Sequence, residues 1–175
     1  MLKYNSTLVL IYNSFNDPLF QNLVFKYLKT LGKTNKYIFY LVTFEQEYFS
    51  ISENEKRKLR KNLIKVGIYW YPLNYHTGNF LLFKKLYDFL NVLFLIGKIR
   101  LSKNTKVIFA FTNIAASFGI IFSKIFSMKM IVYSYEPHSS FLAELNIWSK
   151  KSLKYKLLNS IEKFSGIHGD YILTG

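Results

Sequence analysis

Segments with the spacing of buried strands alternate with segments of helical spacing along almost the whole 175-residue chain. Short runs rich in aliphatic and aromatic residues predict strands at residues 7–13, 36–43, 67–73, 107–111, 129–135 and 171–173. Helical spacing predicts helices at residues 18–31, 53–65, 79–100, 114–126 and 152–164. Strands that are apolar throughout are buried on both faces, so this order favours a parallel sheet covered by helices on both sides. With right-handed crossovers, the predicted fold is α/β, a single Rossmann-like, doubly wound domain with a mostly parallel sheet spanning residues 1–175.

Local signals set the ends of two of these helices. Asp17 followed by Pro18 predicts a helix start, because an aspartate caps the first N–H groups and a proline fits the first turn. Gly32 is expected to end that helix, and Gly166 is expected to end the last one.

The predicted helix 79–100 is unusually apolar. Its polar positions fall on one narrow stripe, made of Lys84, Asp88, Asn91 and Lys98. Nearly all of the remaining circumference is apolar. The longest run without a charge, residues 107–123, is shorter than the about 20 residues that a spanning helix needs, so no membrane span is expected.

The chain carries 24 basic and 10 acidic residues, a formal net charge of +14. Such a surplus suits an anionic membrane surface, a phosphorylated ligand or nucleic acid, although a composition shaped by AT-rich codons explains it equally well. Ser52 and Glu55 form a capping box that opens a basic helix. From this helix and the next we predict a membrane-facing surface of Lys56, Arg57, Lys58, Arg60, Lys61, Lys84 and Lys85. The alternative is an ordinary solvated helix face.

Several classes of site are excluded or disfavoured. The chain has no cysteine, which excludes disulfides, iron–sulfur clusters and thiolate zinc sites. Its three histidines lack metal-ligand spacing, so no metal site is expected. Residues 13–16 stand where a dinucleotide-binding chain would carry a glycine-rich turn, so that class of enzyme is disfavoured. The aromatic residues follow core spacing and do not alternate with basic ones, so nucleic acid is not an expected partner. We expect a cytoplasmic protein, or one peripheral on the inner face of the plasma membrane.

Ligands of doubly wound domains bind beyond the carboxyl ends of the strands, which selects the loops at residues 13–17, 74–78, 112–113 and 136–140. The last is the most informative, because a buried strand runs into Glu136 and His138. We predict that these two hydrogen-bond or exchange protons with a polyhydroxylated ligand as the catalytic pair. The alternative is a capped loop in which Ser139 or Ser140 starts the next helix. The predicted acceptor-binding residues are Asn16, His76, Thr112, Asn113, Ser139 and Ser140.

Glu162 lies on the last predicted helix without a helical charge partner, since Leu158 and Gly166 stand four residues away. It either meets a tertiary contact or is an unpaired surface residue, and the second is the expectation.

An ordered set of segments resembles the N-terminal, acceptor-side domain of a family-four retaining glycosyltransferase of the two-Rossmann-domain (GT-B) type. The segments are Pro18-Leu19 with Tyr27-Leu28, LVTFE at residues 41–45, GIYWYPLNYH at residues 67–76, the loop at residues 136–148, and Glu162 with GDYILT at residues 169–174. The glycine pair common after the first strand of that family is missing, so no phosphate contact is expected there.

The resemblance implies a domain that binds a saccharide or lipid-linked acceptor, often a membrane-borne one, in cell-envelope polysaccharide synthesis. It also implies that a nucleotide-sugar donor would bind a C-terminal donor domain, which residues 1–175 are expected to lack. No cofactor is expected, and the chain is not expected to be active alone or without a donor-domain chain. A second hypothesis is a noncatalytic Rossmann-like module that tethers a partner at an anionic membrane surface. A third, weaker one is a binder of single-stranded nucleic acid.

Overall fold

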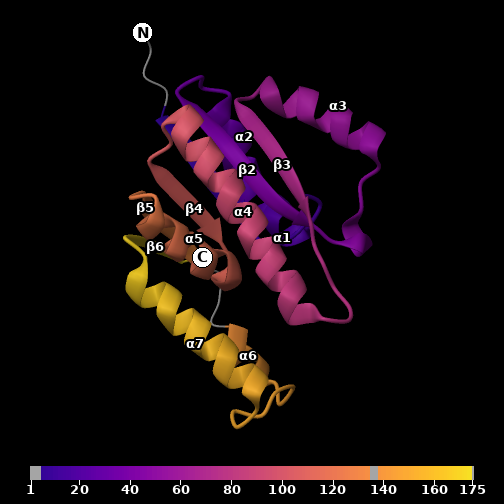
Figure 1. Cartoon of the computed structure of the whole chain (residues 1–175), viewed down its shortest axis with the longest axis vertical. Helices are drawn as coiled ribbons and strands as arrows, with labels where there is room; N and C mark the ends of the chain where they lie inside the picture. The colour runs from indigo at the N-terminus through magenta and orange to yellow at the C-terminus, as the bar shows by residue number, and fades with distance from the viewer. Residues whose placement is uncertain (1–4, 135–137, 175) are drawn as a thin grey trace.

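A computed structural model describes residues 5–134 and 138–174, and it contains one six-stranded, entirely parallel sheet (Figure 1). The strand order is β3-β2-β1-β4-β5-β6. The strands are β1 (Asn5–Ile11), β2 (Tyr37–Glu45), β3 (Ile68–Asn74), β4 (Val107–Phe111), β5 (Lys129–Ser134) and β6 (Tyr171–Thr174). This order confirms the predicted doubly wound, Rossmann-like α/β domain.

Helices connect the strands at every crossover. They are α1 (Pro18–Phe20), the π-helix η1 (Gln21–Phe25), α2 (Lys26–Gly32), the 3-10 helix η2 (Glu47–Phe49), α3 (Glu53–Ile64), α4 (Leu81–Lys103), α5 (Asn113–Ile125), α6 (His138–Glu144) and α7 (Leu153–His168). Figure 1 shows α4 running along the sheet, with α6 and α7 together at one end of the domain.

Two hydrophobic clusters form the core, one on each face of the sheet. Leu10 belongs to the cluster under α4 and α5, and its neighbour Val9 belongs to the cluster under α1, α2 and α3. Both side chains are completely buried. Alternate residues of a strand point to opposite faces, so burial on both sides explains why the strands read as unbroken apolar runs.

The first helix begins where the sequence predicts. The Asp17 carboxylate accepts hydrogen bonds from the N–H groups of Leu19 at 2.8 Å and Phe20 at 3.3 Å, with Pro18 in the first turn. The helical segment ends at Gly32, as predicted.

The expectation that Gly166 ends the last helix is wrong. The helix α7 continues to His168, and Gly169 caps it. A Cβ at Gly166 would meet nothing within 4 Å, whereas a Cβ at Gly169 would lie 2.8 Å from a Val132 methyl. The helix therefore stops where the chain must pass close to β5 before it pairs with that strand as β6.

The polar stripe of α4 is buried at Asp88, although Lys98 near its end is exposed. Asp88, in the middle of that stripe, is only 1% exposed. The exposed side carries large apolar residues instead, namely Phe83, Tyr87, Leu90, Phe94 and Leu101. Within the part of the chain that the structure describes, no helix is both long and apolar enough to cross a membrane.

Candidate functional site

The carboxyl ends of all six parallel strands meet at one edge of the sheet, and the predicted ligand loops at residues 13–17, 74–78 and 112–113 follow β1, β3 and β4 there. In the described residues, two polar clusters at this edge contain predicted acceptor-binding residues. One lies between the end of β3 and α4, around His76 and Asp88. The other joins α5, α6 and α7 around Glu162.

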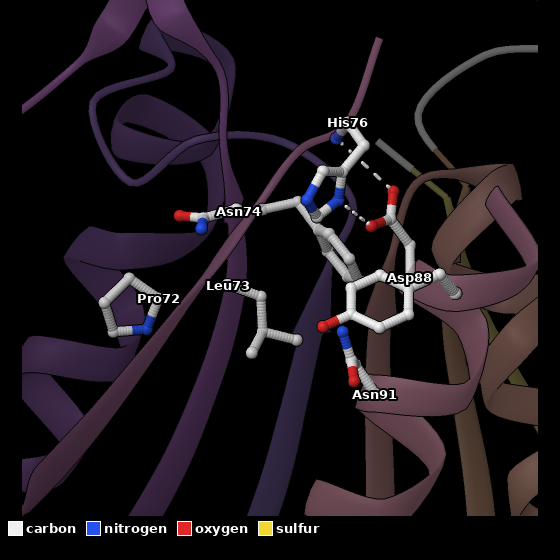
Figure 2. A pocket seen from close by; sticks show the side chains of 8 residues that line it. Pro72, Leu73, Asn74, His76, Asp88 and Asn91 are labelled. Atoms are coloured by element: carbon white, nitrogen blue, oxygen red, sulfur yellow. Dashed lines mark hydrogen bonds and ion pairs between the residues drawn. The ribbon is translucent and has the colours of Figure 1, made fainter. Parts of the chain in front are cut away.

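The first cluster is an imidazole–carboxylate pair (Figure 2). Nδ1 of His76 makes a short hydrogen bond with Oδ1 of Asp88, and the backbone N–H of His76 donates to Oδ2 of Asp88 at 3.4 Å. The Asp88 side chain is 1% exposed, whereas the His76 side chain is 34% exposed. Asp88 therefore anchors the imidazole from inside the domain and leaves part of the ring open to the outside.

The ammonium group of half-buried Lys85 lies behind this pair. Nζ of Lys85 lies 3.7 Å from Oδ2 of Asp88, 3.4 Å from the centre of the Tyr75 ring and 5.3 Å from the centre of the Tyr12 ring. This Nζ is buried and has no hydrogen-bond partner among the described residues. Burial is the largest of the effects that raise the pKa of Tyr12, and the nearby Tyr75 and Asp88 add to it. Because Nζ of Lys85 lies so close to the Asp88 carboxylate, its positive charge offsets the negative charge of Asp88 inside the domain.

A cavity of about 210 Å³ opens beside the His76 ring. It is lined by Phe44, Pro72, Leu73, Asn74, His76, Tyr87, Asp88 and Asn91. Two carboxamides, an imidazole and an exposed phenol therefore share a small space at the ligand edge of the sheet.

In the second cluster, the Glu162 carboxylate holds the start of α6. Oε1 of Glu162 accepts from the backbone N–H of Ser139 at 2.9 Å and from the amide of Asn113 at 3.4 Å. Oε2 of Glu162 accepts a short hydrogen bond from the Ser139 hydroxyl, which itself accepts from the Asn159 amide at 3.2 Å. Glu162 therefore meets a tertiary contact, and the expectation of an unpaired surface residue is wrong.

The start of α5 has an unusual backbone. Thr112 has φ 78° and ψ 157°, a conformation that is essentially confined to glycine and costs of order 1–3 kcal/mol. Its N–H donates to the carbonyl oxygen of Tyr133 at 3.2 Å. The next residue, Asn113, is 9% exposed, and its amide oxygen also accepts from the Ser134 hydroxyl at 3.4 Å. Strain of this kind clusters at functional sites, and the strained residue here directly precedes Asn113, whose amide donates to Glu162.

The structure brings only some of the predicted acceptor-binding residues together. Asn113 and Ser139 meet through Glu162, and Ser139 is completely buried. Asn16 is exposed in a separate shallow hollow of about 370 Å³ beside α3. Ser140 is half-buried.

The predicted catalytic pair falls at the edge of what the structure describes. Glu136 lies outside the described residues, and His138 is described only as the first residue of α6. The alternative placed Ser139 or Ser140 at the start of the next helix, and both residues do lie in the first turn of α6. There Glu162 accepts the N–H and the hydroxyl of Ser139.

The predicted membrane-facing residues divide into two groups. Arg57, Lys58, Arg60 and Lys61 are exposed on α3, and half-buried Lys56 pairs with Glu53 at 2.7 Å. On α4, Lys84 donates to the carbonyl oxygen of Thr77 at 2.7 Å. Lys85 lies inside the domain beside Asp88, so its ammonium group is not part of an outer basic surface.

Sequence reasoning missed two acidic residues at this edge. It treated Asp88 only as part of the polar stripe, although the same stripe faces His76. It also missed Glu45 at the end of β2, which accepts hydrogen bonds from the Thr43 hydroxyl and the Phe15 N–H. Burial raises the pKa of Glu45, while these two hydrogen bonds and the charge of Lys56 act in the opposite direction. The sequence did offer a signal for Glu45: it is a carboxylate at the end of a buried strand, where ligand-binding groups of such a sheet are expected.

Comparison with known proteins identifies the fold. No protein-family model matches the chain, and no curated protein sequence matches it. Among solved structures, UGT2 of Phytolacca americana, complexed with UDP-2fluoro-glucose and pterostilbene, matches with a TM-score of 0.69 at 7% identity, over 99% of this chain and 48% of that one. A UDP-glucosyltransferase from Polygonum tinctorium capable of glucosylating indoxyl matches with a TM-score of 0.65 at 9% identity, over 99% and 47%. A Listeria monocytogenes protein named as a UDP-N-acetylglucosamine 2-epimerase matches with a TM-score of 0.53 at 8% identity, over 98% and 39%.

The chain thus spans about half the length of these solved chains or less, and its fold is that of half of a GT-B glycosyltransferase. At such identities the likeness establishes the fold alone.

Proposed function

We propose that residues 1–175 form the acceptor-binding half of a retaining glycosyltransferase of the family-four kind. The enzyme would transfer a sugar from a nucleotide-sugar donor to a saccharide or lipid-linked acceptor of the cell envelope. The observation that carries the proposal is the polar carboxyl edge of a sheet that matches half of the fold of sugar-transferring enzymes. Amide, imidazole and hydroxyl groups of this edge suit ligand hydroxyls, which both donate and accept hydrogen bonds.

The loop after β1 supports an acceptor role in preference to a donor role. A helix start binds phosphate through its free N–H groups. Here the carboxylate of Asp17 already takes the N–H groups of Leu19 and Phe20. Ser14 is completely buried, and its hydroxyl accepts the N–H of Gln46 at 2.7 Å. The chain's own groups thus fill the place of a diphosphate, and we propose that the donor binds a separate domain or chain.

In this proposal, Glu136 and His138 lie nearest to the reacting acceptor. Glu162 supports the assignment indirectly, because it fixes the backbone of Ser139 next to His138. A histidine at the start of α6 suits proton exchange with a hydroxyl near neutral pH.

The test is a binding comparison by NMR on the isotope-labelled chain, with methyl glycosides and short oligosaccharides against UDP- and GDP-sugars. We expect saccharides to shift signals of residues 112–113 and 138–140, at the starts of α5 and α6, and nucleotide sugars to shift none. His138→Ala should weaken saccharide binding at least tenfold. His168→Ala, which changes the last residue of α7, should leave saccharide binding unchanged. Binding of nucleotide sugars without any binding of saccharides would contradict the proposal.

A second candidate, the membrane tether, is favoured by a specific surface. The exposed stripe of α4 is made of Phe83, Tyr87, Leu90, Phe94 and Leu101, which are 70, 56, 40, 74 and 84% exposed. Their helical spacing places them on one side of a 23-residue helix, as in helices that lie in a membrane interface. The exposed basic residues of α3 would add attraction to anionic lipid.

Sedimentation with vesicles checks this candidate. We expect the chain to sediment with vesicles of phosphatidylglycerol and phosphatidylcholine, and less at high salt, because salt screens the basic surface. A double change of Phe83 and Phe94 to serine should lower the bound fraction at least tenfold, since each phenyl ring contributes about 1.5–3 kcal/mol when buried. Leu153→Ser on α7, where the leucine is 82% exposed, is the matched control. Equal sedimentation of both variants would refute a membrane role for the α4 stripe.

A further inference from the structure

We propose that the cavity between β3 and α4 is a binding subsite for one neutral sugar ring, in which Nε2 of His76 accepts a hydrogen bond from a ligand hydroxyl. Asp88 is the positioning residue that gives the imidazole this role. The inference rests on the proposed acceptor-binding function and deepens it, because it assigns a place and a chemistry to part of the acceptor.

The tautomer follows from the contact with Asp88. A carboxylate only accepts hydrogen bonds, so the ring nitrogen that faces it, Nδ1 of His76, must carry a proton. In a neutral imidazole the other nitrogen, Nε2, is then an acceptor. It has no hydrogen-bond partner among the described residues, and a third of the side chain is open to the outside. Figure 2 shows this nitrogen on the side of the ring away from Asp88.

The Asp88 carboxylate has more contacts than the one hydrogen bond that would hold the backbone of the loop at His76. It is 1% exposed and receives the ring and the backbone N–H of His76, with the Lys85 ammonium group 3.7 Å away. Burying a carboxylate is costly unless it is paired and hydrogen-bonded. The backbone contact alone would tie down the loop. The contact with the ring additionally fixes the direction in which Nε2 points.

The remaining groups of the cavity suit a neutral, hydroxylated ligand. Asn74 and Asn91 each offer a donor and an acceptor, as sugar hydroxyls require. No lysine or arginine lines the cavity in the described residues, since the Lys85 ammonium group is buried behind Asp88. A phosphate or carboxylate would therefore find no cation there. At about 210 Å³ the cavity is smaller than the about 300–1,000 Å³ typical of sites for drug-sized ligands, which favours a single ring.

Tyr87 supplies an apolar surface for the same ring. Its side chain is 56% exposed and lines the cavity one residue before Asp88. Its ring lies 5.5 Å from that of His76 at 78°, so the two rings form an angled wall. The C–H groups of a sugar can pack on the aromatic face while its hydroxyls meet the imidazole and amides.

The experiment uses the ¹⁵N-labelled chain and follows the imidazole nitrogens of its histidines by NMR. We expect the tautomer with the proton on Nδ1 for His76. In titrations with methyl glycosides of common hexoses, at least one should shift Nε2 of His76 and leave exposed His168 unchanged. Asn91→Ala, which does not alter the His76–Asp88 pair, should weaken this binding at least tenfold. Asn16→Ala, in the separate hollow beside α3, should not.

Asp88→Asn is the decisive variant for the positioning role. Since an asparagine amide can also donate to Nδ1, we expect part of the His76 population to move its proton to Nε2, with at least tenfold weaker glycoside binding. Should this variant fail to fold, Asn91→Ala and the wild-type tautomer still decide the inference.

A proton on Nε2 in the wild-type chain overturns the inference, whether or not glycosides bind. Glycoside shifts at residues 112–113 and 138–140 without any at His76 also overturn it and leave the proposed function standing. Shifts confined to His76 and the residues around this cavity support the inference and count against the wider acceptor site at α6.

Discussion

Replacement of Glu162 by alanine should lower the free energy of unfolding by about 2–4 kcal/mol. The carboxylate accepts hydrogen bonds from the N–H and the hydroxyl of Ser139, and Ser139 is completely buried. Alanine would leave the N–H without a partner in a place that water does not reach, and a buried unpaired donor costs about 1–3 kcal/mol. It would also remove the acceptor of the Asn113 amide. The measurement is equilibrium unfolding in urea, with the slope compared between variants.

Glu162→Gln is the matched control for this prediction. Its carbonyl oxygen can still accept the Ser139 N–H, and its NH₂ can donate to the Ser139 hydroxyl, so we expect less than half of the alanine effect. A loss below about 0.5 kcal/mol for Glu162→Ala, the range of an ordinary surface substitution, would show that the contact does not hold α6 in place.

The second large effect concerns two helical glycines with opposite surroundings. A Cβ at Gly32 would lie 2.0 Å from the carbonyl oxygen of Val66, which belongs to the backbone and cannot turn aside. Gly32→Ala should therefore lower the free energy of unfolding by about 3 kcal/mol, the upper end of the usual cost of overpacking. The end of α2 and the turn before β3 would have to separate.

Gly166→Ala is the reverse case. Its Cβ would meet nothing within 4 Å, and the residue lies inside α7. Alanine is the better helix former by about 0.8–1.0 kcal/mol, so we expect a gain in stability of up to that size. The two variants should therefore move the midpoint of thermal unfolding in opposite directions. A shift of the same sign and size in both would mean that helix propensity, and not the close approach at Gly32, decides the outcome.

Glu162 and Asp88, two of the carboxylates at the carboxyl edge, have different neighbours. Glu162 is used to hold backbone and side chains at the start of α6. Asp88 is used to orient a histidine that remains partly open. This division directs the search for acceptor contacts toward His76 and His138, and it treats the buried hydroxyl of Ser139 as support for α6.

The α4 helix shows that periodicity identifies a polar stripe without deciding whether the stripe faces the core or the solvent. The sequence correctly indicated one narrow polar stripe along this helix, but a stripe of four polar residues has no inherent inside or outside. The partner of Asp88 is His76, which arrives from the end of β3, and this contact buries the stripe at its centre. The apolar residues on the other side, such as Phe94, are left exposed.

The sequence alone predicted those features that depend on residues close together along the chain. All six strands, the Asp17 cap and the end of the first helix at Gly32 follow from residues within a few positions of one another. The parallel, doubly wound sheet follows as well, because crossover handedness is a general property of L-amino acids.

Only the tertiary structure decided which polar groups meet. Ser139 and Glu162 are 23 residues apart, Asn113 and Glu162 are 49 apart, and His76 and Asp88 are 12 apart across a loop. Each pair forms because the fold sets two elements side by side, and hydrogen bonds act over about 3 Å whatever the separation along the chain. The same reason explains one of the two contacts of Lys85. Asp88 is its neighbour one turn along α4, as the sequence spacing indicates, but the Tyr75 ring, 3.4 Å from Nζ, comes from the loop after β3 and meets it only through the fold.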